Sequence, residues 1–410
     1  MEDTGKRRLA AAAVALAGLV YFFVCARPLP KALVLEPRWA RTLGAASGEQ
    51  AAPASGQPRP AASTATAAAS SVAPAAGAPV AAGSAGLAAA APLSASPQGG
   101  FDADSGWIPY RIAGNYGYFD EEGKVALKAA SPFGVALAKG AYVAYDRLPE
   151  SLLLRSASGR ELARVAEAGY PFFAAGRLFV MRPGQSSVAE IGPDGNTLWS
   201  RDFPSIVTAF DASPGLALFG LMDGSLVGVG ADGAELLSFA PGGSRVAGVY
   251  GCAVSPDGLM AAAVTGLDRQ RLVVLERRSS AFRVTYHRWL ESDFRRQVSM
   301  AFTEDGRYLA YEIPSGLGVY DREKRAESKI ASAALSGVGL SSPERGLLLA
   351  LEGGGASRGL LVASPSGRRL FTAPFAAAES FLARRGDALF LGMADGSGSA
   401  SILRMDFKEE

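Results

Sequence analysis

Histidine is nearly absent from this 410-residue chain, which contains only His287. One imidazole cannot build a metal site made of several histidines, and a Ser-His-Asp hydrolase would have to rely on this single residue. The two cysteines, Cys25 and Cys252, lie in different kinds of sequence, so no internal disulfide framework is expected. The globular part has no phosphate-binding glycine loop that ends a strand and opens a helix. We therefore predict no enzyme, no catalytic residue, no cofactor and no metal site, while rings of Asp and Glu or a calcium site remain open.

An excess of one charge sign is also lacking, because 41 Lys and Arg oppose 39 Asp and Glu, which gives a net charge of +2. Without a strong basic field, no nucleic-acid partner is predicted. Composition changes sharply along the chain. From Leu43 to Gly100 nearly every residue is Ala, Pro, Ser, Gly or Thr, and only Glu49 and Arg59 are charged. From Trp107 onward, aromatic, β-branched and charged residues return in globular proportions.

An apolar run at residues 9–26 follows a short basic tail at residues 1–8. As a helix, its eighteen residues would rise about 27 Å, which is close to the hydrocarbon thickness of a bilayer. The apolar region of a cleaved signal peptide is usually shorter, at about 7–15 residues. We predict an uncleaved membrane-anchor helix at 9–26, with the remaining chain on the periplasmic or extracytoplasmic side. Cleavage near Cys25, its lipidation and the opposite orientation are the alternatives, since basic residues also follow the run.

The Ala/Pro/Ser-rich stretch cannot bury enough apolar surface to offset the entropy of ordering it. We predict a disordered linker at residues 27–105 and a globular domain at residues 106–410. About 58 residues of flexible coil would span roughly 40 Å root-mean-square. The globular domain would therefore hang from the membrane on a loose tether.

Strand-like runs joined by tight turns repeat through the globular part. The first four turning points are glycines spaced 36, 36 and 38 residues apart. Asp-Gly and Ser-Gly pairs suit such hairpins, because Gly takes a positive φ without strain. The seven turning points are Gly123, Gly159, Gly195, Gly233, Ser279, Lys324 and Gly367.

A second set of seven hairpins alternates with the first, from FGVALAKGAYVAYD to FLARRGDALFLGMAD. Two hairpins per repeat give four strands per unit of about 36–46 residues, which is the size of a β-propeller blade. We therefore predict an all-β fold, a seven-bladed β-propeller, with eight blades as the alternative. A β-sandwich also has many short strands, but it would not explain two hairpin types that alternate in register over three hundred residues.

The order of the hairpins predicts how the ring closes. The globular part opens with an outer hairpin at Tyr116–Ala130, and its last inner hairpin lies at Phe381–Asp395. A single blade that combines the two would hide the open sheet edges. The segments Ile108–Ala113 and Ser401–Phe407 then compete for one strand position, and the sequence does not decide between them.

Short motifs recur at the turns. Ser255-Pro256-Asp257-Gly258 and Val319-Tyr320-Asp321 are similar to the S-P-D-G turn and the V-W-D of WD40 blades, and Asp194–Trp199 is similar to the D-G-x-x-L-W of PQQ-like blades. The resemblance to these two superfamilies covers roughly residues 107–407 and implies a propeller. The chain has no Trp-Asp dipeptide and no Gly-His pair, so the hydrogen-bonded tetrad of WD40 blades is not expected. Fold alone does not determine function.

Aromatic and arginine residues gather in one predicted loop. The stretch Tyr286–Arg296 bridges an outer strand and the next inner strand, and such loops lie on the propeller face around the channel mouth. Trp, Tyr and Arg are enriched at binding hot spots. The alternative is that Trp289 and Phe294 pack between neighbouring blades. The candidate partner-binding residues are Tyr286, Arg288, Trp289, Phe294, Arg295 and Arg296.

The function predicted from these features is a membrane-tethered, non-enzymatic scaffold that binds a protein partner in the cell envelope. The alternative is a ligand-binding or degenerate enzyme propeller, with a polysaccharide or a small molecule at the central channel. Acidic rings around the channel would favour the alternative, and an apolar, aromatic face would favour the scaffold.

Overall fold

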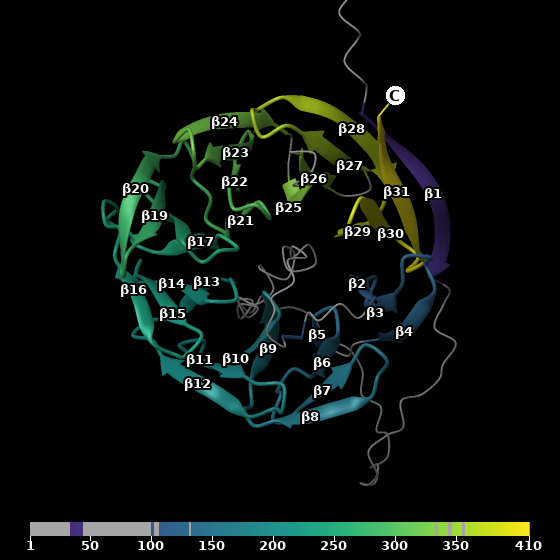
Figure 1. Ribbon diagram of the computed structural model, residues 1–410, viewed down its shortest axis with the longest axis horizontal. Coiled ribbons are helices and arrows are strands. Elements are labelled where there is room, and N and C mark those ends of the chain that lie inside the picture. The colour runs from purple at the N-terminus through teal and green to yellow at the C-terminus, as the bar shows by residue number, and fades with distance from the viewer. Residues whose placement is uncertain are drawn as a thin grey trace, which may run out of the picture.

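A computed structural model gives the fold of the chain. All the secondary-structure elements among the residues that it describes are β-strands. It describes residues 33–43, 100–101, 106–130, 133–332, 335–342, 347–354 and 357–409. The strands form eight antiparallel sheets arranged around a ring (Figure 1). Each sheet is one blade, and we number the blades in chain order and give their strands from the innermost to the outermost.

The first four blades follow the chain from residue 108 to residue 239. Blade one holds β2 Ile108–Ile112, β3 Asn115–Phe119 and β4 Val125–Ala130. Blade two holds β5 Gly134–Leu137, β6 Ala141–Tyr145, β7 Leu152–Ser156 and β8 Glu161–Val165. Blade three holds β9 Tyr170–Ala174, β10 Arg177–Met181, β11 Ser187–Ile191 and β12 Thr197–Asp202. Blade four holds β13 Val207–Ala212, β14 Leu216–Leu221, β15 Leu226–Gly230 and β16 Glu235–Phe239.

The last four blades complete the ring, and the eighth takes its outermost strand from the N-terminal part of the chain. Blade five holds β17 Val249–Val254, β18 Met260–Thr265, β19 Arg271–Arg278 and β20 Ala281–Trp289. Blade six holds β21 Met300–Phe302, β22 Tyr308–Ile313, β23 Gly316–Asp321 and β24 Ala326–Ala331. Blade seven holds β25 Leu335–Ser342, β26 Leu347–Gly354, β27 Ser357–Ala363 and β28 Arg369–Ala376. Blade eight holds β29 Glu379–Arg385, β30 Ala388–Ala394, β31 Ala400–Glu409 and β1 Leu33–Leu43.

The propeller is confirmed, but the predicted number of seven blades is wrong, and the eight-bladed alternative is the one observed. Both predicted sets of hairpins exist, with seven members each. The error lay in joining the outer hairpin near Tyr116–Ala130 to the inner hairpin near Phe381–Asp395. In the structure these hairpins belong to two neighbouring blades, since β3 and β4 lie in blade one while β29 and β30 lie in blade eight.

Strand β1 closes the ring. It pairs antiparallel with β31, from Leu33 opposite Glu409 to Leu43 opposite Ala400. Residues 33–43, which the sequence analysis assigns to the linker, are therefore part of the propeller. The segments Ile108–Ala113 and Ser401–Phe407 do not compete either, because β2 and β31 lie in different blades.

This closure corrects the predicted tether. Because β1 belongs to blade eight and β2 to blade one, the Ala/Pro/Ser-rich residues 44–99 connect two parts of the ring. They do not separate the predicted membrane segment from the globular domain. The predicted anchor at 9–26, the basic tail at 1–8 and the remaining linker residues 27–32, 44–99 and 102–105 lie outside the described residues. In the part of the chain that the structure describes, no helix is long and apolar enough to cross a membrane.

The turns have the predicted chemistry. Gly195 and Gly233, which follow Asp194 and Asp232, have φ values of 84° and 81°, a conformation that a residue with a Cβ rarely adopts. The side-chain oxygen of each aspartate accepts a hydrogen bond from the backbone N–H two residues later, at 3.1 and 3.0 Å. These aspartates therefore act as turn formers.

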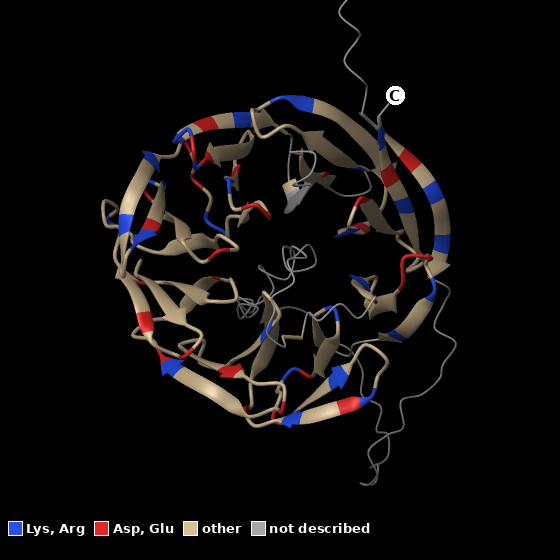
Figure 2. Ribbon diagram, viewed as in Figure 1, with Lys and Arg blue, Asp and Glu red and all other residues tan. Residues whose placement is uncertain are grey.

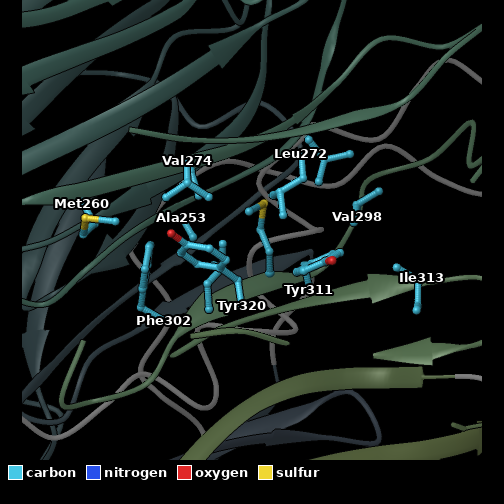
Figure 3. Close-up of a cluster of buried hydrophobic side chains, with 13 residues drawn as sticks. Ala253, Met260, Leu272, Val274, Val298, Phe302, Tyr311, Ile313 and Tyr320 are labelled. Atoms are coloured by element: carbon cyan, nitrogen blue, oxygen red, sulfur yellow. The ribbon is translucent and has the colours of Figure 1, made fainter. Parts of the chain in front are cut away.

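The core lies between the blades. Figure 3 shows one of its clusters, in which side chains of blade five and blade six interdigitate. Met260 and Val274 of blade five pack against Tyr311 and Tyr320 of blade six, and all four are at most 2% exposed. Each cluster of this kind needs two sheets, so a blade reaches full burial only when both of its neighbours are in place.

The ring has two distinct faces. The turns between the first and second strands lie on the same face as the turns between the third and fourth strands, as shown in blade two, where Ala157 N donates to Gly140 O at 3.0 Å. We call this the turn face. The other connections lie on the opposite face, which we call the loop face. Leu43 ends β1 at the loop face, because its partner Ala400 begins a third strand there.

Trp39 should be the main anchor of the closing strand. Its indole lies 6.1 Å from the ring of Phe390 and packs against Gly123 of blade one. We expect Trp39→Ala to lower the free energy of unfolding by about 2–4 kcal/mol, because a large, half-buried aromatic contact is lost at the seam. Arg38→Ala is the matched control, since its 2.8 Å ion pair with Asp406 is exposed and contributes at most about 1 kcal/mol. The free energy of unfolding is measured by denaturation in urea. Equal decreases for Trp39→Ala and Arg38→Ala would contradict this role.

Candidate interaction surface

The six predicted binding residues lie around the outer edge of blade five. Tyr286, Arg288 and Trp289 belong to β20, the outermost strand, while Phe294, Arg295 and Arg296 lie in the connection from β20 to β21. The structure gives these residues different surroundings, and it does not bring all of them together in one patch.

Tyr286 and Arg288 join blade five to blade six. The Tyr286 ring lies 4.6 Å from the ring of Tyr320. Arg288 forms an ion pair with Glu327, a residue whose side chain is 4% exposed, and Tyr311 Oη donates to the same carboxylate at 2.8 Å. A buried carboxylate with both a cation and a hydroxyl partner is a structural element of the ring.

Phe294 and Arg296 shape the connection itself. Phe294 packs against the core cluster between blades five and six. The Arg296 guanidinium lies 4.3 Å from the centre of the Phe294 ring and forms two hydrogen bonds to the Glu312 carboxylate, at 2.9 and 2.6 Å. Hydrogen bonding to Glu312 raises the pKa of Arg296. Arg295, between them, is exposed.

Trp289 lies at the loop face, where it is half-buried. The guanidinium carbons of Arg269 and Arg271 lie 4.4 and 5.3 Å from its ring centre, which is the geometry of cation–π contacts. The far edge of the indole rests on Gly243, where an added Cβ would come within 2.7 Å of the ring. The side chain is thereby held flat against the connection between blades four and five.

Three large apolar side chains that the sequence analysis did not single out lie on the same face. Ile206, Met222 and Val246 are 41%, 57% and 49% exposed. They lie on successive connections around blade four. Met222 N donates to Ile206 O at 2.8 Å, and Leu267 N donates to Val246 O at 3.1 Å, so the backbone fixes these loops side by side. We call Ile206, Met222, Val246 and Trp289 the apolar loop surface.

Charged groups border the apolar loop surface. Arg245, whose side chain is 91% exposed, pairs with Asp268 at 3.5 Å. The hydroxyl of Ser244 donates to the Asp268 carboxylate and lowers its pKa. Elsewhere both signs of charge are spread around the ring (Figure 2). The local pattern of exposed apolar groups next to arginines is typical of protein-binding surfaces.

A half-buried acid, Asp211, lies on the innermost strand of blade four and contacts blade five. The Oδ2 of Asp211 on β13 accepts a hydrogen bond from Val254 N on β17, at 2.7 Å. Burial raises the pKa of Asp211 to about 7, against the opposite effect of the N–H groups of Val254 and Ala212. Burial, and then the charge of Asp211, raise the pKa of the nearby Cys252 thiol well above its usual value. Within the described residues, no three His, Cys, Asp or Glu side chains form a group that could hold a metal ion.

Comparisons with known proteins agree with the architecture. A family model described as "beta-propeller protein" matches residues 1–408. An uncharacterised protein of Treponema pallidum (strain Nichols) is 32% identical over 216 residues, which are 53% of this chain and 57% of that protein. The chain therefore spans little more than half the length of this relative.

Two solved structures have a similar fold. BamB from Moraxella catarrhalis superimposes with a TM-score of 0.52 at 12% identity, covering 76% of this chain and 99% of BamB. The computationally designed protein Ika8 superimposes with a TM-score of 0.56 at 13% identity, covering 75% of this chain and 94% of Ika8. At these identities the likeness concerns the fold alone.

Asp211→Asn should make the stability of the protein less dependent on pH. Folding raises the pKa of this carboxyl from 3.8 to about 7, so its contribution to stability is complete below pH 3.8 and is lost as the pH rises through 7. The asparagine keeps the acceptor for Val254 N and cannot ionise. We expect the variant to gain about 1–3 kcal/mol over the natural protein between pH 5 and pH 8.

Urea denaturation at a series of pH values measures this gain. The exposed Asp293→Asn is the control for the change in net charge. If the free energy of unfolding changes with pH in the same way for the natural protein and for Asp211→Asn, this acid is not the source of the pH dependence.

Proposed function

The chain belongs to a family of β-propeller proteins, and we propose that it is a non-enzymatic interaction module that holds a protein partner in the cell envelope. The apolar loop surface supports this proposal most directly. Ile206, Met222 and Val246 expose large apolar groups that backbone hydrogen bonds hold in fixed positions. Preorganised groups lose little entropy on binding, so their burial by a partner translates efficiently into affinity.

Chemistry around the surface indicates the kind of partner. Trp289 with Arg269 and Arg271 forms a rigid, cationic rim beside the apolar side chains. A partner that presents apolar residues flanked by Asp or Glu would match this arrangement. Of the residues predicted from the sequence, Trp289 belongs to the apolar loop surface, and the exposed Arg295 lies on the same face.

We also propose that residues 9–26 anchor the chain in the membrane. Only six residues separate this segment from Leu33, and they can span about 20 Å when extended. Leu33 starts β1 at the turn face, because it pairs with Glu409 at the end of β31. An anchored propeller would thus keep the rim of its turn face near the bilayer, while the loop face stays accessible to a partner in the periplasm.

Met222→Asp combined with Val246→Asp should abolish partner binding while the propeller stays folded. Both side chains are about half exposed, so we expect the melting temperature to change by less than about 2 °C, whereas burying two carboxylates at an interface should weaken capture at least about tenfold. The measurement is quantitative mass spectrometry of proteins crosslinked to the full chain in its native membrane.

Leu198→Asp is the matched control. Leu198 is 59% exposed but lies on the outer strand β12, away from the loop face. Partner capture that survives the double substitution, or that is lost equally in the control, would rule out the apolar loop surface as the binding site.

A further inference from the structure

In the part of the chain that the structure describes, blade one has three strands where each other blade has four, and they correspond to the second, third and fourth strands of the other blades. The turn between β3 and β4 identifies these strands as an outer hairpin. Asp120 N donates to Lys124 O, and Gly123 N donates to Asp120 O, both at 3.0 Å. Gly123 of this turn packs against Trp39 of β1, the outermost strand of blade eight, just as Gly233 in the outer turn of blade four packs against Trp199 of β12, the outermost strand of blade three.

The direction of β2 leads to the same conclusion. Gly106, just before β2, accepts a hydrogen bond from Arg385 Nη1 at the turn-face end of β29, at 2.6 Å. Ala113, just after β2, donates its N–H to Glu379 at the start of β29, also at 2.6 Å. Strand β2 therefore runs from the turn face to the loop face, as the second strand of every blade does. Among the described residues, no strand lies between β2 and the channel.

The edge of β2 that faces the channel carries backbone groups that pair with no strand of the described ranges. A two-residue turn at Ala113 and Gly114, with φ values of 51° and 71°, makes Ile112 and Asn115 a hydrogen-bonded pair. Bonding alternates along an antiparallel ladder, so the N–H and C=O of Arg111 and the C=O of Pro109 point away from β3. A proline suits such an edge strand, because it has no N–H to leave unpaired.

Two side chains of β2 are less buried than the side chains of several other second strands. The second strands β10, β14 and β18 are buried along their whole length. In β2 the buried Tyr110 and Ile112 pack toward blade eight with Phe381, while Pro109 is half-buried and Arg111 is exposed. The side of β2 that faces away from blade eight is thus less covered than the second strands of blades three, four and five.

We propose that the open edge of β2 binds an extended peptide of a partner protein, which adds as an inner strand antiparallel to β2 and places an acidic residue against Arg111. Backbone pairing supplies affinity in this mode of recognition, and side chains supply specificity. Arg111 is exposed, so an acidic residue of the peptide can reach its guanidinium. Residues 44–99 are poor competitors, because Ala, Pro and Gly disfavour strands.

This inference is independent of the apolar loop surface, which lies on other blades. The first step of the test uses the full chain with the photocrosslinker benzoylphenylalanine in place of Pro109, which leaves Arg111 intact, irradiated in cells that express it. Mass spectrometry identifies the attached peptide. The same crosslinker in place of Val125, which is 39% exposed on the outer strand β4 of the same blade, is the control.

In the second step, a synthetic copy of the captured stretch is titrated against the purified chain. We expect it to contain Asp or Glu among alternating apolar residues and to slow hydrogen exchange at the Arg111 amide. Arg111→Pro, which removes the edge donor, should weaken binding at least about tenfold. Arg111→Glu keeps the backbone edge and reverses the charge, so it should weaken binding similarly and tests the proposal even if the proline variant does not fold.

Three results would overturn the proposal. The first is an adduct that joins position 109 to residues 44–99 of the same chain, and the second is the absence of an adduct at 109. The third is a captured peptide that binds Arg111→Pro and Arg111→Glu as tightly as the natural chain. Loss of partner capture by Met222→Asp with Val246→Asp bears only on the loop face, so the two proposals fail separately.

Discussion

Every blade of this propeller is apolar on two faces, and the ring must therefore close before all of the blades are fully buried. Middle strands such as β14 and β15 are buried at all positions, which requires a neighbour on each side. The ladder between β1 and β31 supplies the last neighbour and joins residues more than 350 positions apart, as Arg38 and Asp406 show. Because this contact is so distant in sequence, its loop-closure entropy is a cost that the packing of all eight blades must offset.

Local sequence determines the hairpins, which is why they could be predicted. A turn at Gly195 or Gly233 needs a positive φ, and the preceding aspartate stabilises it within four residues. The number of blades depends on which hairpins share a sheet, and that is a long-range property. Seven inner and seven outer hairpins fit seven blades, but they also fit eight when the first blade lacks an inner hairpin and the last takes β1 as its outer strand. Pro37 lies at a register shift in β1, and a proline within a segment argues against a strand, so β1 was not predicted from the sequence.

The interaction surface was harder to predict for a related reason. Aromatic residues of one loop look alike in a sequence, yet Tyr286 packs on Tyr320 of the next blade while Trp289 lies at the surface between two arginines. Conversely, Ile206 and Met222 are isolated apolar residues in their own loops and become a patch only when the ring places the loops together. The sequence indicated a binding surface only through the aromatic and arginine residues of Tyr286–Arg296. Of these residues, Trp289 alone belongs to the apolar loop surface.

The contact between blades eight and one also explains how blade one is held in the ring. Blade one is held through its outer half, where Gly123 packs against Trp39 and Arg404 donates to Glu121 O at 3.0 Å. Lys128 of β4 reaches Leu43 O at the end of β1, at 3.2 Å. These contacts come from blade eight and do not involve the channel side of β2. If a peptide adds to the inner edge of blade one as proposed, these outer contacts would stay in place.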